Sequence, residues 1–185
     1  MQPLRPSAAE LLAAIGRGVP DVLGPGLGVL FCGINPGLYS AAVKHHFARP
    51  GNRFWPALHE AGFTPRLFSP WDERELLTLR LGVTNLVNCA TAAASELTPD
   101  QLRRGGQQLL RKIRRCRPRF LAVLGVGAYR RAFHRPGATP GRQADSLGAT
   151  VVWLLPNPSG LNAHYQLADL VAQFRSLREA VERER

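Results

Sequence analysis

The sequence predicts a three-layer α/β/α fold built on a central four-stranded, largely parallel sheet. Four short apolar runs have the length and the β-branched or aromatic content of buried strands: Val29 to Cys32, Val83 to Val87, Phe120 to Leu124 and Val151 to Leu155. Segments with helical patterning separate them. Continuous apolar runs are typical of strands covered on both faces, so we expect parallel strands with helices on each side.

The expected helices are marked by caps and by amphipathic spacing. Ser7 to Ile15 begins with a Ser7 cap and has Glu10 three residues later, which is the pattern of a capping box. Pro99 to Cys116 predicts a long basic amphipathic helix with glycines near its middle, and an ordinary solvated helix face is an adequate explanation of its charge. Three further helices are expected at Phe54 to Ala61, Tyr129 to Phe133 and Leu167 to Glu182. The segment Asp72 to Leu79 also has helical patterning.

The chain length of 185 residues predicts one domain over residues 1–185. Within it, residues 1–25 are expected to form an N-terminal helix and a linker that ends in the glycine-rich GPGLG segment. That glycine cluster precedes the first strand instead of following it, which argues against a dinucleotide-binding fingerprint. Nothing in the sequence indicates an oligomer interface, and we expect a monomer.

The net charge is +11, and all of the 24 basic residues except Lys44 and Lys112 are arginine. Such an excess attracts polyanions, and the planar arginine fork can donate two hydrogen bonds to one phosphate. The charge therefore indicates a nucleic-acid partner. The alternative is an arginine-rich composition that reflects genome base bias.

The cysteine content and the hydropathy predict a cytoplasmic protein. The three cysteines are odd in number and widely spaced, which is typical of reduced thiols and not of a disulfide framework. No apolar run approaches the length of a membrane span. His45 and His46 stand without any zinc-hydrolase or deaminase motif, so we expect no metal and no cofactor.

Two Asn-Pro turns follow expected strands, one at Asn35 to Gly37 and one at Asn157 to Gly160. The carboxyl ends of parallel strands form the ligand crevice in open α/β sheets, and both turns are expected there. Proline restricts the preceding asparagine to extended backbone, so each amide is held at a strand tip. Good turn chemistry alone also explains this pattern.

Several motifs together resemble the mismatch-specific uracil/thymine DNA glycosylases of the uracil-DNA glycosylase superfamily. They are GINPG at Gly33 to Gly37, HFARPGNRFW at His46 to Trp55, GVTNLV at Gly82 to Val87 and NPSGLN at Asn157 to Asn162, and the likeness covers roughly residues 27–177. The resemblance implies a four-stranded parallel sheet with flanking helices, and removal of uracil mispaired with guanine from double-stranded DNA. It also implies a bacterial-type protein that is associated with the nucleoid through DNA.

The resemblance also implies roles in bond cleavage. Asn35 stands where stronger superfamily members have aspartate, and it would position the attacking water through its carbonyl oxygen, because an amide cannot accept a proton at neutral pH. Backbone amides around Ile34 and Phe47 would stabilise the departing uracil anion. Asn157 would help as a weaker donor than the histidine of related enzymes. A slow enzyme is therefore expected.

Base extrusion has its own set of implied residues. Phe47 would stack under the extruded base, or alternatively form a lid over the core. Leu161 would wedge into the vacated stack, unless it only precedes the last helix, while Gly160 and Asn162 would meet the orphaned guanine. Tyr39 and Ser40 are candidates to shape the space beside the C5 position of the pyrimidine.

Ala93 marks a departure from the family pattern. The CATAAASEL loop, residues 89–97, has no side-chain polar group at residues 92–94, where related proteins can present one near the pocket. A chain that lacks a catalytic group there could bind DNA and cleave it poorly.

The predicted function is monofunctional hydrolysis of uracil opposite guanine, leaving an abasic site. Neither lysine lies in a motif, which argues against a Schiff-base lyase step. The alternatives are other lesions in the same pocket, namely single-stranded uracil, thymine opposite guanine and deaminated purines, or a non-catalytic protein that binds damaged DNA.

Overall fold

The computed structural model describes residues 5–184, and it has the predicted α/β architecture with one strand more than expected. The sheet order is β2-β1-β3-β5-β4. Four strands run parallel, as predicted: β1 (Val29–Gly33), β2 (Leu81–Asn85), β3 (Phe120–Leu124) and β5 (Thr150–Leu155). They place their carboxyl ends along one edge of the sheet, where the candidate motifs begin.

The prediction of four strands was wrong because it missed β4 (Gly141–Leu147), which pairs antiparallel with β5 at the edge of the sheet. Its sequence, GRQADSL, is polar and mostly exposed, so it has no apolar run to mark it. Edge strands need only one partner and are commonly polar, which hides them from a search for buried strands. The extra strand lies away from β1 and β2, at the opposite edge.

The expected helices are present, with small shifts in their ends. The capping box of α1 (Ala8–Ala13) and the full extent of α4 (Pro99–Cys116) match the prediction. α3 (Phe54–Glu60), α5 (Val126–Phe133) and α6 (Leu167–Arg183) differ from the expected ranges by a few residues. The segment Pro70–Leu79 is a 3₁₀ helix, η1, and two short elements were not predicted: α2 (Leu38–Val43) and the 3₁₀ turn η2 (Ala94–Glu96).

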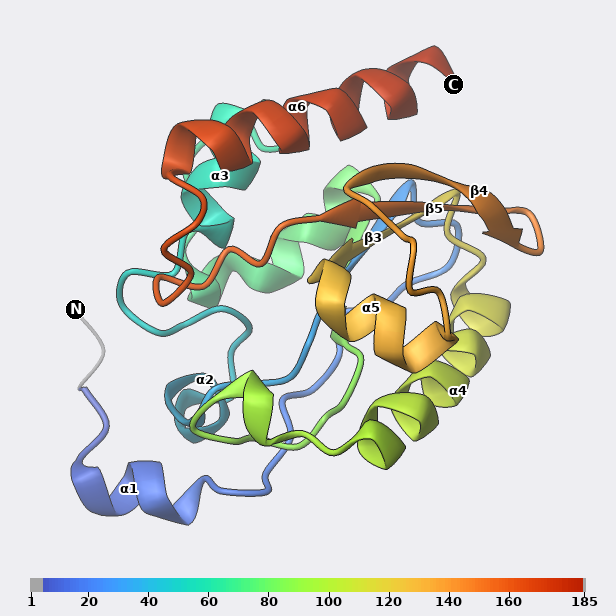
Figure 1. The fold of residues 1–185 in the computed structure, drawn as a ribbon. Coiled ribbons are helices and arrows are strands. Elements are labelled where there is room, and N and C mark those ends of the chain that lie inside the picture. Colours follow the sequence, from blue (N-terminus) through green and yellow to red (C-terminus); the bar gives the residue numbers. More distant parts are fainter. Residues whose placement is uncertain (1–4, 185) are drawn as a thin grey trace.

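Helices cover both faces of the sheet (Figure 1). Alternate residues of β1 show why: Phe31 faces a cluster with α3 and α6, while Leu30 faces a cluster with α4 and α5. The first cluster is aromatic, with Phe31 and Phe174 stacked at 5.9 Å between ring centroids. β1 and β3 are thus buried on both sides, which is the origin of their continuous apolar runs.

A glycine in the middle of α4 has a packing role that helix propensity does not reveal. A Cβ atom on Gly105 would lie 2.5 Å from the carbonyl oxygen of Leu86, just beyond β2. The missing side chain lets α4 approach the end of β2 closely, which compensates for the lower helix propensity of glycine. Within residues 5–184, no helix has the length and apolar character needed to span a bilayer.

Candidate active site

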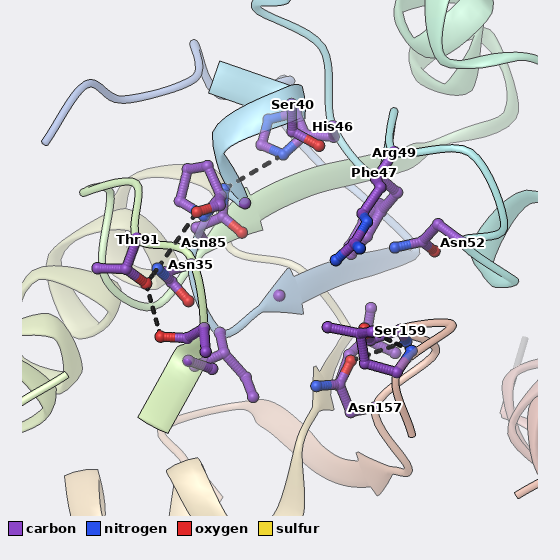
Figure 2. A pocket seen from close by; sticks show the side chains of 18 of the residues that line it. Asn35, Ser40, His46, Phe47, Arg49, Asn52, Asn85, Thr91, Asn157 and Ser159 are labelled. Atoms are coloured by element: carbon purple, nitrogen blue, oxygen red, sulfur yellow. Dashed lines mark hydrogen bonds between the residues drawn. The ribbon is translucent and has the colours of Figure 1, made fainter. Parts of the chain in front are cut away.

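A cavity of about 290 Å³ lies at the carboxyl edge of the parallel strands (Figure 2). The loops after β1, β2 and β5 and the segment 46–52 line it. Eight of the ten predicted site residues meet there: Ile34, Asn35, Ser40, Phe47, Ala93, Asn157, Leu161 and Asn162. The sequence separation between these residues is large, so the sheet brings them together.

The two other predicted residues lie beside this cavity. Tyr39 lines an adjoining cavity on the other side of the segment 47–52. Gly160 packs on Gly51, where an added Cβ atom would lie 2.6 Å from the Gly51 carbonyl oxygen. This close approach joins the loop after β5 to the segment after Phe47.

Asn35 is anchored through its amide nitrogen. Its Nδ2 donates to Thr91 Oγ1 at 2.8 Å and to the carbonyl oxygens of Cys89 at 2.9 Å and Pro36 at 3.2 Å. All three partners accept hydrogen bonds, so the opposite amide orientation would set the Asn35 oxygen against two carbonyl oxygens. Asn35 therefore presents Oδ1 to the cavity (Figure 2).

Asn157 is anchored in the opposite sense. Its Oδ1 accepts a hydrogen bond from the backbone N–H of Ser159 at 3.0 Å, which is the Asx turn expected before a proline-containing loop. Its backbone carbonyl accepts a bond from Asn162 Nδ2 at 2.9 Å. The Asn157 Nδ2 group is left to face the cavity as a donor (Figure 2).

Phe47 lines the cavity in a strained backbone conformation. Its φ is 53°, whereas the other four non-glycine residues with positive φ in the described chain each end a helix. Such a conformation costs about 1–3 kcal/mol and persists only where neighbouring contacts enforce it. Here the backbone N–H of His46 donates to Glu73 Oε2 at 2.8 Å, and that of Ala48 donates to Ser40 Oγ at 3.0 Å.

The Phe47 ring is fixed from behind. It stacks on Phe54 with 4.1 Å between ring centroids and an interplanar angle of 25°. Phe47 is only partly buried, and it packs against the aromatic core while it also lines the cavity. Among residues 5–184, no group accepts a hydrogen bond from the backbone N–H of Phe47 or of Ile34. A flat apolar surface and two free backbone donors are thus available in one cavity.

Asn85 is a site residue that the sequence analysis did not single out. It ends β2 and is buried at the cavity wall, with Nδ2 at 3.4 Å from His46 Nδ1. His46 Nε2 lies 2.9 Å from the Pro20 carbonyl oxygen, so Nε2 carries the proton and Nδ1 accepts from Asn85. Burial lowers the pKa of His46 and so favours the neutral ring, although nearby Glu73 opposes this shift. Asn85 Oδ1 is therefore free to accept.

The loop that carries Leu161 is held by Arg53. The Arg53 guanidinium donates to the backbone carbonyls of Ser159, Asn162 and Tyr165, and the Arg53 backbone N–H donates to the Pro158 carbonyl at 3.0 Å. Leu161 is nevertheless 66% exposed at the tip of this loop. A large, mostly exposed apolar side chain on a braced loop is suited to insertion into another molecule.

Ala93 lies at the cavity rim beside Asn35. Thr91 Oγ1 accepts from Asn35 Nδ2 and donates to the Ala93 carbonyl oxygen, each at 2.8 Å. The Ala93 backbone N–H donates to Glu96 Oε1 at 2.8 Å. No acidic residue is among those that line the cavity within residues 5–184, so the described site has no carboxylate to accept a proton.

The sequence analysis did not place six polar lining residues in the site: His46, Arg49, Asn52, Asn85, Thr91 and Ser159. The usable signal was their position, since Asn85 is the last residue of β2 and Thr91 follows in the loop. In a parallel sheet, a polar residue at the carboxyl end of a buried strand is a candidate for the ligand crevice. In the described part of the chain, no three His, Cys, Asp or Glu side chains are grouped so as to hold a metal ion.

Comparisons with known proteins agree with this geometry. The family model for the uracil DNA glycosylase superfamily matches residues 20–182. A solution NMR structure of a putative uracil DNA glycosylase from Methanosarcina acetivorans has a similar fold, with a TM-score of 0.57 and 21% sequence identity. The alignment covers 89% of this chain and 99% of that one. Since the family model spans both Asn-Pro turns and every strand, the chain belongs to the uracil DNA glycosylase superfamily.

Proposed function

We propose that this protein is a monofunctional, mismatch-specific uracil DNA glycosylase of the mismatch-specific uracil/thymine type, which removes uracil opposite guanine from double-stranded DNA. The observation that carries the proposal is the opposed anchoring of Asn35 and Asn157, which present an acceptor and a donor to one cavity. Superfamily membership supports action on uracil in DNA. The finer specificity rests on the cavity and on the Leu161 loop.

Uracil would be recognised by stacking and by its N3–H group. An extruded base lies on the free side of Phe47, and Asn85 Oδ1 accepts from N3–H. Cytosine has an acceptor at N3, where uracil has a donor. The N3 atom of cytosine would therefore face the Asn85 oxygen, a second acceptor, and no hydrogen bond would form. This difference matters because the normal partner of guanine is cytosine, and a glycosylase acting on G·U must leave it intact.

Bond cleavage would depend on orientation and on leaving-group stabilisation. Asn35 Oδ1 accepts a hydrogen bond from water and places its oxygen toward C1′. The C1′–N1 bond breaks with its electron pair going to the uracil ring, the water oxygen bonds to C1′, and the water proton passes to solvent. Donors from the Ile34 and Phe47 backbones and from Asn157 Nδ2 stabilise the charge that develops on uracil.

The absence of a carboxylate among the described lining residues predicts a slow step. An amide orients water without accepting its proton, so the contribution of a general base, typically about 10²- to 10⁴-fold, is missing. No lysine is among the described residues that line the cavity, which favours hydrolysis over a Schiff-base lyase reaction. We propose that the protein acts on DNA as a cytoplasmic monomer.

The Leu161 loop supports the preference for mismatched duplex. Flipping a base costs a few kcal/mol and costs least at a mismatch. Leu161 would fill the vacated position, and the backbone near Gly160 and Asn162 would contact the orphaned guanine. The bracing of this loop by Arg53 gives the wedge a fixed position relative to Phe47.

A single-turnover assay with enzyme in excess tests the proposal. Matched labelled duplexes carry G·U, A·U or G·T, a single strand carries uracil, and alkali reveals abasic sites. We expect product chiefly from G·U. If single-stranded uracil or the G·T duplex gave as much product as the G·U duplex, the enzyme would act on a broader range of lesions than G·U mismatches. Binding of G·U duplex without any abasic product would instead indicate a damage-binding protein.

A further inference from the structure

A second cavity, of about 340 Å³, lies directly beside the base cavity. The two share Phe47, Arg49 and Asn52 in their walls, so the segment 47–52 separates them. Because the cavities adjoin, the second cavity is a candidate site for a nucleotide next to one whose base occupies the first cavity.

The walls of the second cavity combine aromatic rings with positive charge. Tyr39, Trp55 and Trp71 contribute the rings, and Arg5 and Arg49 contribute the charge. No acidic residue belongs to this wall in the described part of the chain. Aromatic platforms with arginines are typical of sites that bind single nucleotides of a strand, where the rings stack on the base and the cations contact phosphate.

Trp71 is positioned as an open stacking surface. It is 42% exposed, whereas Trp55 is 4% exposed. Its ring lies 5.5 Å from the His45 ring between centroids, and His45 Nδ1 is 2.8 Å from Glu73 Oε1. These contacts hold one side of Trp71 in place while much of the indole stays accessible.

Carboxylates near Trp71 in the sequence are already engaged. Both oxygens of Glu73 are used, one by His45 and one by the backbone of His46. Asp72 accepts from Ser69 and pairs with Arg66 at 3.2 Å. The side chain of Arg49, by contrast, forms no hydrogen bond or ion pair with any residue of the described range 5–184, although its backbone carbonyl accepts a hydrogen bond from the Asn52 N–H. The charge presented by this wall is thus positive.

We propose that the second cavity binds the nucleotide adjacent to the extruded one in the lesion strand, with its base on Trp71 and its phosphate at Arg49. This inference rests on the proposed function, because it takes the first cavity to hold the extruded uracil. The proposed site would make binding depend on one flanking nucleotide as well as on the lesion.

The experiment compares duplexes that differ by one flanking nucleotide. The lesion strand carries 2′-fluoro-deoxyuridine, an analogue that resists cleavage, opposite guanine. On the 5′ side the strand ends either at the lesion or one nucleotide beyond it, and a second pair of duplexes differs in the same way on the 3′ side. Binding is measured by anisotropy of a label on the other strand. We expect one of the two added nucleotides to lower Kd by about tenfold.

Variants assign this gain to the second cavity. Trp71→Ala should abolish the gain, and Trp71→Phe should keep most of it. Leu67→Ala removes another exposed apolar side chain that lines neither cavity, and should leave the gain unchanged. Arg49→Gln should lower the slope of log K against log salt by about 0.9, whereas Arg74→Gln, at an arginine outside both cavities, should not.

Tryptophan emission gives a second readout. Trp71 is the accessible indole, since Trp55 and Trp153 are buried, and stacking of a base should quench it only with the longer strand. Kd values that change with neither added nucleotide would overturn the inference and leave the proposed function intact. An equal loss of affinity for all duplexes in Trp71→Ala would do the same. Failure of every duplex to bind would overturn both.

Discussion

The two Asn-Pro turns have the same start in sequence and present opposite atoms to the same cavity. Asn35 gives its nitrogen to Thr91 and to two backbone carbonyls, which leaves its oxygen free. Asn157 gives its oxygen to the backbone of Ser159, which leaves its nitrogen free. The partners of the amide, and not the residue type, determine whether an asparagine presents an acceptor or a donor to the cavity.

A third asparagine extends the comparison. Asn85 lies on the neighbouring strand, and its amide nitrogen is taken by His46, so it too presents an oxygen. Its partner is a titratable ring, whereas the partners of Asn35 and Asn157 are backbone groups and a hydroxyl. The three amides therefore differ in how their orientation responds to pH.

Removal of the first turn's amide should have the largest effect. Asn35→Ala leaves the attacking water without its acceptor, and we expect the single-turnover rate on G·U to fall about 100-fold, because misplaced reactants cost that much. Kd for the uncleavable duplex should change little. An undiminished rate would contradict the role of Asn35 in positioning water.

Addition of an acid near the first turn should act in the opposite direction. Ala93→Asp places a carboxylate at the cavity rim, next to the Thr91 hydroxyl that anchors Asn35, and it can accept the proton of the attacking water. We expect the single-turnover rate on G·U to rise by about tenfold or more. Ala93→Asn, which adds an amide of the same shape, should give a much smaller gain. A rate unaffected by aspartate would exclude proton transfer at this position.

Truncation at the second turn should separate duplex from single strand. Leu161→Ala removes the exposed wedge and should slow uracil release from G·U duplex by about tenfold, because the vacated stack is not filled. Release from single-stranded DNA should be nearly unchanged. Equal losses on the two substrates would show that Leu161 contributes to the base cavity itself.

Protonation of His46 should disturb the third asparagine. The pKa of His46 is lowered in the folded protein, so between its folded and unfolded pKa values the unfolded chain binds more protons. Stability should therefore fall as the pH drops below about 6.5, the unfolded value. Thermal melts across this range, with His46→Gln as the control, measure the effect, and a pH-independent difference between the two proteins would contradict it.

Much of the fold was predictable from local pattern because strands covered on both faces leave an unmistakable apolar signature. Phe120–Leu124 and Pro99–Cys116 were predicted to the residue. β4 was not, since an edge strand with polar residues has no such signature. From the sequence, Gly105 only weakens the predicted helix. The structure shows that its missing side chain allows the close approach of the Leu86 backbone.

Many residues of the site were predictable from the sequence, but the atoms that they present to the cavity were not. Turn chemistry and family motifs pointed to Asn35, Phe47 and Asn157, which the sheet does bring together. The free atom of each amide depends on partners such as Thr91, which is 56 residues from Asn35 in sequence. Asn85 and the strained φ of Phe47 depend on similarly distant contacts, which a sequence pattern does not encode.

The most direct test of the opposed amides is an isosteric exchange at both turns. Asn35→Asp keeps an oxygen toward the water, although its second oxygen replaces the nitrogen that donates to the Pro36 and Cys89 carbonyls. Asn157→Asp keeps the oxygen that accepts from Ser159 and replaces a donor with a negative charge facing the departing uracil anion. We predict that, in single-turnover assays on the same G·U duplex, Asn157→Asp is at least about tenfold slower than Asn35→Asp. Equal rates, or a slower Asn35→Asp, would contradict the assignment of water to one turn and of uracil to the other.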